Sequence, residues 1–281
     1  MRALRPLDAG PLRVFILLIG ACLVAGCDGE DDGRPKLGVA TSYLECAVRD
    51  LAGDEFQIVR MLPPGSCPGH FDVTPAMVSR LRECSLLLRF GFQDGLDARL
   101  ARLKEDGLRS VPIPAGEGLC VPATYAETCR AVCAALCEAH PGREAAYAAR
   151  LTRIEARMAK LAEEAASAVR RAGLEGAPVI ASGHQAAFCE VLGLRVLATY
   201  TGGGTQSLSR LRACIAEGER AGVRLVVATL QEGPQLADPL AHRLDARAVV
   251  FSNFPSMDDG QKTFDDLVRD NVAALTDGGQ P

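Results

Sequence analysis

The chain has 281 residues, of which 48% are hydrophobic and 23% charged, as in an ordinary soluble globular protein of one large domain or two modest ones. Its formal net charge of −4 argues against a nucleic-acid-binding protein, which would carry a basic face. Tryptophan is absent and aromatic residues make up only 5%, which argues against stacking on bases or sugars as the main activity.

The N-terminal segment is typical of an export signal. Three arginines precede the apolar run 14–24, which is too short to span a bilayer. The run ends in VAGC, which resembles the lipobox of bacterial lipoproteins, and the resemblance implies cleavage before Cys27 and acylation of that residue. We therefore expect a leader at 1–27, a polar tether at 28–36 and a lipid anchor in the bilayer. The alternative is a plain secretory signal with a chance cysteine.

Strand-like and helix-like segments alternate along the rest of the chain. The first series is expected at residues 37–41 (strand), 42–53 (helix), 56–62 (strand), 74–84 (helix), 85–92 (strand), 110–114 (strand) and 123–140 (helix). The second series is expected at residues 177–182 (strand), 184–193 (helix), 194–200 (strand), 207–222 (helix), 223–230 (strand), 234–245 (helix), 246–253 (strand) and 260–275 (helix). Such alternation predicts an α/β fold of parallel sheets with helices on both faces.

Between the two series, residues 142–173 contain no internal glycine or proline, so they predict one helix of about 30 residues, roughly 45 Å long. Its apolar residues form a single stripe, namely Leu151, Ile154, Met158 and Leu161. A coiled-coil partner helix is one interpretation. A rigid spine joining two lobes is favoured, because no second long helix is present. The expected domains are an N-terminal lobe (37–140), a linking helix (141–173) and a C-terminal lobe (174–281).

The cysteine content does not resemble a small disulfide scaffold. Of eleven cysteines, Cys22 and Cys27 fall in the leader, which leaves nine, and an odd number in an exported protein means at least one is unpaired. Cys129, Cys133 and Cys137 recur every four residues on one helical stripe. Free cysteine behaves as a small hydrophobic residue, so this stripe predicts core packing.

Side chains that can bind a metal follow the expected strands. They are Cys67 and His70 after strand 56–62, Glu117 and Cys120 after 110–114, His184 after 177–182, and Glu232 after 223–230. Ligands of open α/β sheets gather outside the carboxyl ends of the strands, and imidazole and thiolate are ligands for Zn²⁺. Each position also has an ordinary structural interpretation. His184 could cap its helix, Cys120 could be buried packing, Cys67 and His70 could be a loop pair without a ligand, and solvated loop acids are favoured for both glutamates.

Two loops resemble the ligand loops of the zinc/manganese-binding solute-binding proteins of bacterial ABC importers. PPGSCPGHFDVTP, residues 63–75, is similar to the first loop, with the histidine displaced by one place to His70 and Cys67 where an aspartate is common. SGHQAAFCEVLGLRV, residues 182–196, matches the third loop through His184. The sequence departs from the family where Glu117 replaces a histidine and Ser252 replaces an aspartate.

The resemblance implies a periplasmic or cell-surface, lipid-anchored, monomeric carrier that holds one ion between two lobes and delivers it to an inner-membrane permease. The implied ligands are His70 with Cys67 or Cys120 from the first lobe and His184 from the second, while Glu117 and Glu232 are further candidates. A Cys/His-rich set favours Zn²⁺ over Mn²⁺ or another divalent metal. The carrier would not be an enzyme. The rival interpretations are an exported zinc-dependent hydrolase, with a glutamate as general base, and an exported thiol protein, although neither an H-E-x-x-H nor a C-x-x-C motif is present.

Overall fold

The computed structural model describes residues 33–63, 66, 72–201, 207–257 and 261–277. The chain divides into two compact units, residues 1–34 and residues 35–281. The expected leader, with Cys27, and most of the expected tether lie outside the described residues. In the part of the chain that is described, no helix combines the length and the apolar character that a membrane crossing requires.

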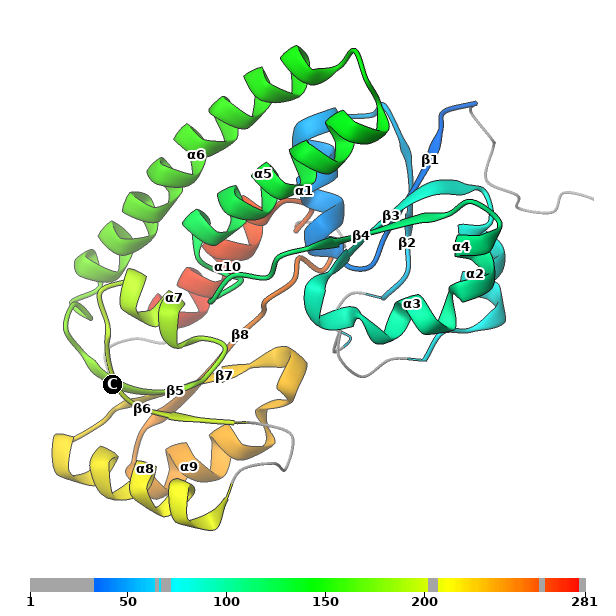
Figure 1. Ribbon diagram of the computed structural model, residues 1–281. Coiled ribbons are helices and arrows are strands. Elements are labelled where there is room, and N and C mark those ends of the chain that lie inside the picture. Colours follow the sequence, from blue (N-terminus) through cyan, green and yellow to red (C-terminus); the bar gives the residue numbers. More distant parts are fainter. Residues whose placement is uncertain (1–32, 64–65, 67–71, 202–206, 258–260, 278–281) are drawn as a thin grey trace, which may run out of the picture. The chain divides into compact units, whose positions relative to one another are not determined.

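The first lobe is built on a four-stranded parallel sheet with the strand order β2-β1-β3-β4 (Figure 1). Its strands are β1 (Lys36–Val39), β2 (Gln57–Arg60), β3 (Cys84–Phe90) and β4 (Arg109–Ile113). Its helices are α1 (Ser42–Ala52), α2 (Pro75–Leu81), α3 (Gly95–Arg99), α4 (Ala101–Glu105) and α5 (Pro122–Ala139), with a 3-10 turn η1 (Gly91–Gln93). Val39 pairs with Arg60 on one side and with Leu88 on the other. The carboxyl ends of neighbouring strands therefore meet at one edge of the sheet.

The second lobe repeats this topology, with the strand order β6-β5-β7-β8 and all pairs parallel. Its strands are β5 (Pro178–Ser182), β6 (Arg195–Tyr200), β7 (Leu225–Thr229) and β8 (Arg247–Phe251). Its helices are α7 (Ala186–Val191), α8 (Leu208–Ala221), α9 (Ala237–Leu244) and α10 (Phe264–Thr276), with 3-10 turns η2 (Leu230–Glu232) and η3 (Pro234–Leu236). The prediction of two parallel α/β sheets is confirmed.

The predicted long helix is α6 (Glu144–Arg171), which has 28 residues. It lies alongside α5 and also packs against α1 and α10 (Figure 1). Ile154, Met158 and Leu161 of the predicted apolar stripe are buried. The helix therefore holds elements of both lobes on one face, which is the spine expected from the sequence.

An aromatic cluster joins the two lobes directly. Tyr125 of α5 stacks on Phe264 of α10 with ring centroids 4.0 Å apart and an interplanar angle of 6°. Tyr43 of α1 meets the edges of Phe264 and Phe254 at 5.6 and 6.3 Å. All four rings belong to one buried hydrophobic cluster that includes residues of both sheets. Because apolar burial stabilises the native state in proportion to the area removed from water, this cluster stabilises the lobes as a single folded body.

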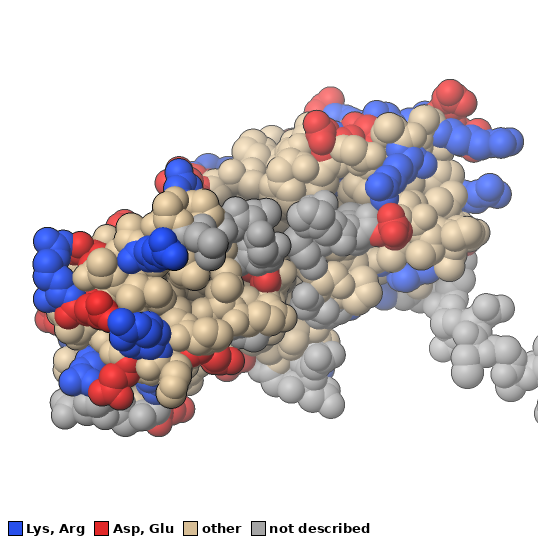
Figure 2. Space-filling model, turned by 90° about the horizontal axis from the view of Figure 1, so that it is seen from below, with Lys and Arg blue, Asp and Glu red and all other residues tan. Residues whose placement is uncertain are grey.

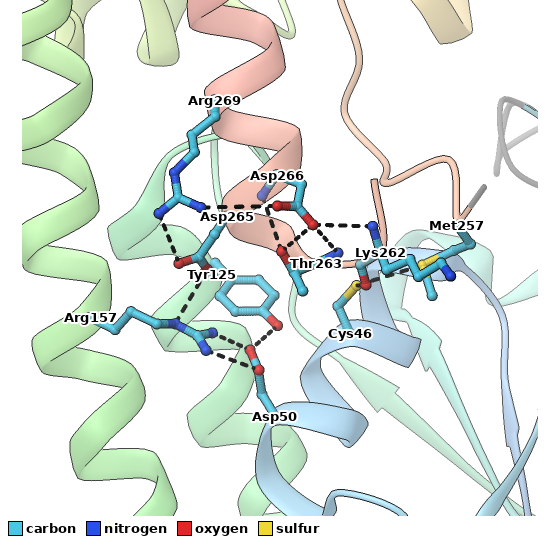
Figure 3. A network of polar contacts seen from close by, with 10 residues as sticks. All are labelled: Cys46, Asp50, Tyr125, Arg157, Met257, Lys262, Thr263, Asp265, Asp266 and Arg269. Carbon is cyan, nitrogen blue, oxygen red and sulfur yellow. Dashed lines mark hydrogen bonds and ion pairs between the residues drawn. The ribbon is translucent and has the colours of Figure 1, made fainter. Parts of the chain in front are cut away.

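A polar network lies beside these rings and centres on Arg157 of α6 (Figure 3). The Arg157 guanidinium donates to both carboxylate oxygens of Asp50 on α1, and its Nε lies 3.3 Å from Oδ1 of Asp265 on α10. The Tyr125 hydroxyl also donates to Asp50, at 2.7 Å. Burial raises the pKa of Asp265, and the nearby Arg157 opposes that rise. One cation of the long helix thus neutralises two carboxylates that come from different lobes.

A second ion pair joins β3 to α3 within the first lobe. Arg89 on β3 is almost fully buried, and its Nε and Nη2 donate to the two carboxylate oxygens of Asp97 on α3, at 2.9 and 2.8 Å. Ser110 on β4 donates to the same carboxylate at 2.7 Å. The hydrogen bond from Arg89 is the main cause that holds the pKa of Asp97 well below its usual range. The buried charge of Arg89 is therefore offset only while the Asp97 carboxylate is ionised.

Replacing Asp97 by Asn is expected to lower the free energy of unfolding by about 2 kcal/mol at pH 7, because the Arg89 charge stays buried without its partner. The folded-state pKa of Asp97 is depressed, so its stabilisation is present above the unfolded pKa of about 3.9 and is lost as the pH falls below that value. Urea unfolding of both proteins from pH 7 down to pH 2 measures the difference. Exposed Asp106→Asn serves as the control. A difference between wild type and Asp97→Asn that does not shrink in acid would contradict this role.

Several local predictions differ from the structure in their boundaries. The helix expected at 74–84 begins at Pro75 after the Thr74 cap, as predicted, but ends at Leu81. Helices α3 and α4 were not expected, because they are short and Leu100 interrupts them. The last helix begins at Phe264, where Thr263 and Asp266 form a capping box, rather than at residue 260. The predicted burial of the α5 cysteines is confirmed for Cys129 and Cys133, whereas Cys137 is half-buried.

Charged side chains of both signs are interspersed on the face shown in Figure 2, where uncharged residues occupy much of the middle. On this face the described residues form no continuous basic stripe.

Candidate metal-binding site

A cavity of about 710 Å³ opens where the carboxyl ends of β4, β5, β7 and β8 lead into their loops. Its lining combines residues of both lobes, namely Phe92, Ala115, Gly116, Glu117, Gly118, Leu119, Gly183, His184, Ala186, Ala187, Glu190, Thr229, Gln231, Glu232, Asn253 and Phe254. The location agrees with the rule that open α/β sheets bind ligands beyond the carboxyl ends of their strands.

The first lobe contributes the loop between β4 and α5. Glu117 is exposed on this loop, and the Thr124 hydroxyl donates to its backbone carbonyl at 2.8 Å, which ties the loop to the first turn of α5. Gly118 has φ +67°, and a Cβ there would lie 2.9 Å from the Cβ of Ala187 on α7. A side chain at this position would collide with the second lobe. Glycine therefore lets the Glu117 loop approach α7 closely.

The second lobe contributes a histidine and a carboxylate that already touch. His184 follows β5, and its Nε2 lies 3.2 Å from Oε1 of Glu232 in the turn after β7. The Ser182 hydroxyl donates to the other oxygen, Oε2, at 2.6 Å, and itself accepts from the Thr229 hydroxyl at 2.8 Å. Ser182 and Thr229 are both buried, so this chain fixes the carboxylate from behind.

The two partners differ in their exposure. The side chain of His184 is 64% exposed and that of Glu232 only 15%. The hydrogen bond to Glu232 raises the pKa of His184, against the opposing effect of burial. The pair therefore presents an accessible imidazole nitrogen next to a carboxylate oxygen whose position is fixed by hydrogen bonds.

Behind the cavity, a buried polar web surrounds the thiol of Cys120. The thiol is fully buried, donates to the Ser252 carbonyl at 2.9 Å and to Oδ1 of Asn253 at 3.3 Å, and accepts from Asn271 at 3.4 Å. Burial raises the pKa of this thiol, which disfavours the thiolate form that binds metals. Cys120 is absent from the cavity lining. The hydrogen bonds of the Cys120 thiol thus join the β4–α5 loop to the residues that follow β8.

Three of the candidate ligands, Glu117, His184 and Glu232, line the cavity, and His184 and Glu232 are in direct contact. Cys67 and His70 lie outside the described residues. The other histidines are elsewhere: His140 ends α5 against the ring of Phe56, and His242 is exposed on α9. Among the residues that the structure describes, no three His, Cys, Asp or Glu side chains are grouped closely enough to hold a metal.

Sequence reasoning missed the residues that support or extend the site. Ser182 and Thr229 are the last residues of β5 and β7, and as strand residues they gave no ligand signal. Phe92 lies in the turn η1 and Glu190 within α7, and both line the cavity although neither was a candidate ligand. The position of Ser182 and Thr229 at the carboxyl ends of adjacent strands was the one available clue, because such residues face the ligand crevice.

The comparisons with known proteins agree with this architecture. The family model described as "Zinc-uptake complex component A periplasmic" (ZnuA) matches residues 39–278. No curated protein matches the sequence.

Solved structures with the same fold are found among periplasmic metal-binding proteins. The Mn-bound periplasmic metal-binding protein of Candidatus Liberibacter asiaticus has a TM-score of 0.73 at 15% identity, covering 87% of this chain and 99% of that chain. A structure of ZnuA has a TM-score of 0.68 at 14% identity, covering 87% and 100%. A zinc-bound deletion mutant of ZnuA has a TM-score of 0.70 at 14% identity, covering 88% and 100%. At these identities the likeness establishes the fold.

Proposed function

Because the chain belongs to the ZnuA family of periplasmic zinc-uptake components, we propose that it binds Zn²⁺ between its two lobes and delivers the ion to an inner-membrane permease. Proteins of this family are the metal-binding components of ABC importers in the periplasm, and they are not enzymes. The family assignment therefore gives no support to the exported hydrolase or the thiol protein.

The observation that carries the proposal is the contact between His184 and Glu232. Their facing atoms are 3.2 Å apart at the cavity wall. Two donors that bind one tetrahedral zinc ion at about 2.1 Å each are separated by roughly 3.4 Å. The pair is therefore spaced like two ligands of one ion. An ion that replaces the shared hydrogen bond would need little movement of either side chain.

The remaining donors would come from the first lobe. Glu117 lines the same cavity, and His70, outside the described residues, belongs to the loop that resembles the family's first ligand loop. Cys67 is the second candidate of that loop. The ligand role predicted for Cys120 has less support, because its buried thiol is already hydrogen-bonded and does not line the cavity. We propose His70, His184 and Glu232 as the main ligands, with Glu117 beside them.

Zinc is expected to stabilise the protein more than manganese does, because imidazole ligands bind Zn²⁺ more strongly than Mn²⁺. A ligand that binds only the folded state at a thousandfold excess over its Kd stabilises by about 4 kcal/mol, which corresponds to a rise in Tm of about 10 °C for a chain of this size. Thermal unfolding of chelator-treated protein with either metal measures the two shifts. Equal shifts for Zn²⁺ and Mn²⁺, or no shift at all, would contradict a zinc carrier.

We also propose that residues 1–27 are a leader and that 28–36 form a tether, so that an acylated Cys27 anchors the mature protein. The mature protein would be a monomer with an N-terminal lobe (37–140), a linking helix (141–173) and a C-terminal lobe (174–281). Cys27→Ser is expected to move the protein from the membrane fraction to the soluble periplasmic fraction. Its zinc-induced rise in Tm should equal that of the wild type, because residue 27 precedes the first strand at Lys36. Cell fractionation followed by immunoblotting measures the distribution. Retention of the variant in membranes would show that the lipobox interpretation is wrong.

A further inference from the structure

The cavity at the candidate site is much larger than a metal ion requires. A water molecule accounts for about 30 Å³ in the liquid, so a fully hydrated divalent ion with six waters occupies roughly 180 Å³. The cavity measures about 710 Å³. This volume falls in the range of small-molecule sites, which is about 300–1,000 Å³.

The walls of the cavity are suited to an organic group. Phe92 is 50% exposed, and its ring stacks on Phe90 with centroids 5.3 Å apart and an interplanar angle of 16°. Of the four large apolar side chains that are exposed in the described part of the chain, Phe92 alone lines this cavity. Leu119 and Phe254 add further apolar surface. A fixed, exposed aromatic face is what a flat ring of a ligand can stack on.

The polar groups of the cavity define the charge of the ligand. Glu117, Glu190 and Glu232 line it together with His184, and the described lining contains neither lysine nor arginine. Such a cavity favours a neutral or positively charged ligand over an anion. Asn253 accepts hydrogen bonds through its Oδ1 from Gln185 at 2.9 Å and from Cys120 at 3.3 Å. The side-chain NH₂ of Asn253 can then donate a hydrogen bond to a carboxylate oxygen of the ligand at the cavity wall.

We propose that the cavity takes the ion as a complex with a small amino-acid-type chelator that is neutral or positive overall and carries a planar ring. The inference rests on the proposed function and specifies the chemical form in which the protein binds the ion. His184 and Glu232 supply two donors to the ion, and the amine and ring nitrogens of the chelator take the two positions that ligands of the first lobe would occupy around the free ion. The ring lies against Phe92 and the carboxylate accepts from Asn253. No covalent bond is made or broken.

The test uses the chelator-treated mature protein and three zinc sources: Zn²⁺ alone, Zn²⁺ with L-histidine, and Zn²⁺ with citrate, whose complex is anionic. Isothermal titration measures apparent affinity, and native mass spectrometry measures the mass that is bound. By mass spectrometry we expect one zinc ion and one histidine bound to each protein molecule. In the titrations, the concentrations of histidine and citrate are chosen so that both leave the same concentration of free zinc. Under these conditions the apparent affinity for zinc should be at least tenfold higher with histidine than with citrate. A bound mass of zinc alone, or equal affinities with the two chelators, would overturn the inference.

Phe92→Ala is expected to lower the ratio of the affinity for zinc–histidine to the affinity for Zn²⁺ alone by about tenfold, the scale of one lost aromatic contact. Val191→Ala is the matched control, because Val191 is an exposed apolar residue of α7 outside the cavity lining, and its ratio should stay at the wild-type value. An unchanged ratio in Phe92→Ala would overturn the inference. Failure of the proposed function is distinguishable, because the protein would then bind zinc from none of the three sources.

Discussion

Replacing His184 by Ala is expected to lower the affinity for zinc by more than about 100-fold. Loss of an outer partner of a metal ligand typically costs about 10–100-fold, and His184 is proposed as a ligand itself. Its exposed imidazole faces a carboxylate that is fixed by Ser182, and the second lobe has no other imidazole within the described cavity lining. Isothermal titration of zinc into the chelator-treated protein measures the loss.

His242→Ala is the matched control, because His242 is an exposed histidine of α9 that does not line the cavity, and its zinc affinity should equal that of the wild type. Glu232→Gln should weaken binding by about 10–100-fold, since it keeps an oxygen near Ser182 but loses the charge. Cys120→Ser should leave the affinity within a few-fold of the wild type. A folded His184→Ala protein that binds zinc with full affinity would refute the site between the lobes.

Replacing Arg157 by Met is expected to destabilise the protein by about 3 kcal/mol, because Asp50 would lose its cation and Asp265 would keep only the Arg269 contact at 4.0 Å. Breaking a fully buried pair costs about 3–5 kcal/mol, and we take the low end because the Arg157 side chain is 38% exposed. Methionine retains the apolar stem of the side chain, so the measured change reports the charge. Equilibrium unfolding in urea at pH 7 measures it.

Arg153→Met provides the comparison within the same helix. Arg153 is exposed on α6, and surface substitutions of this kind usually change stability by less than about 0.5 kcal/mol. If the two variants were equally stable, Arg157 would not be the link between α1 and α10 shown in Figure 3. Two-state unfolding of the wild type is expected as well, since one buried cluster contains residues of both sheets.

The fold was largely predictable because its signals are local. Buried parallel strands such as LVVAT in β7 are continuous apolar runs, and the α6 stripe repeats at helical spacing. Boundaries were less predictable where tertiary contacts decide them. Helices α3 and α4 are too short to be recognised by periodicity, and they are held in place by the contacts of Leu96, Leu100 and Leu103 with the first sheet's core.

The candidate site was predictable only in part. His184, Glu117 and Glu232 follow strands, and the rule that ligands gather at the carboxyl ends of parallel strands was enough to nominate them. The same rule nominated Cys120, although its thiol lies behind the cavity wall among Ser252, Asn253 and Asn271. Sequence position fixes the loop on which a side chain lies. It does not fix the direction in which the side chain points.

The two α/β series, the long helix between them and the likeness of two loops to metal-ligand loops follow from local sequence patterns, because period, length and loop composition are properties of short segments. Which distant side chains meet depends on the packing of separate elements. The 3.2 Å contact of His184 with Glu232, the Arg157 link between Asp50 and Asp265, and the exposed ring of Phe92 in the cavity each join residues that are far apart in the chain. Such contacts depend on how separate elements pack against one another, and no local pattern encodes that packing.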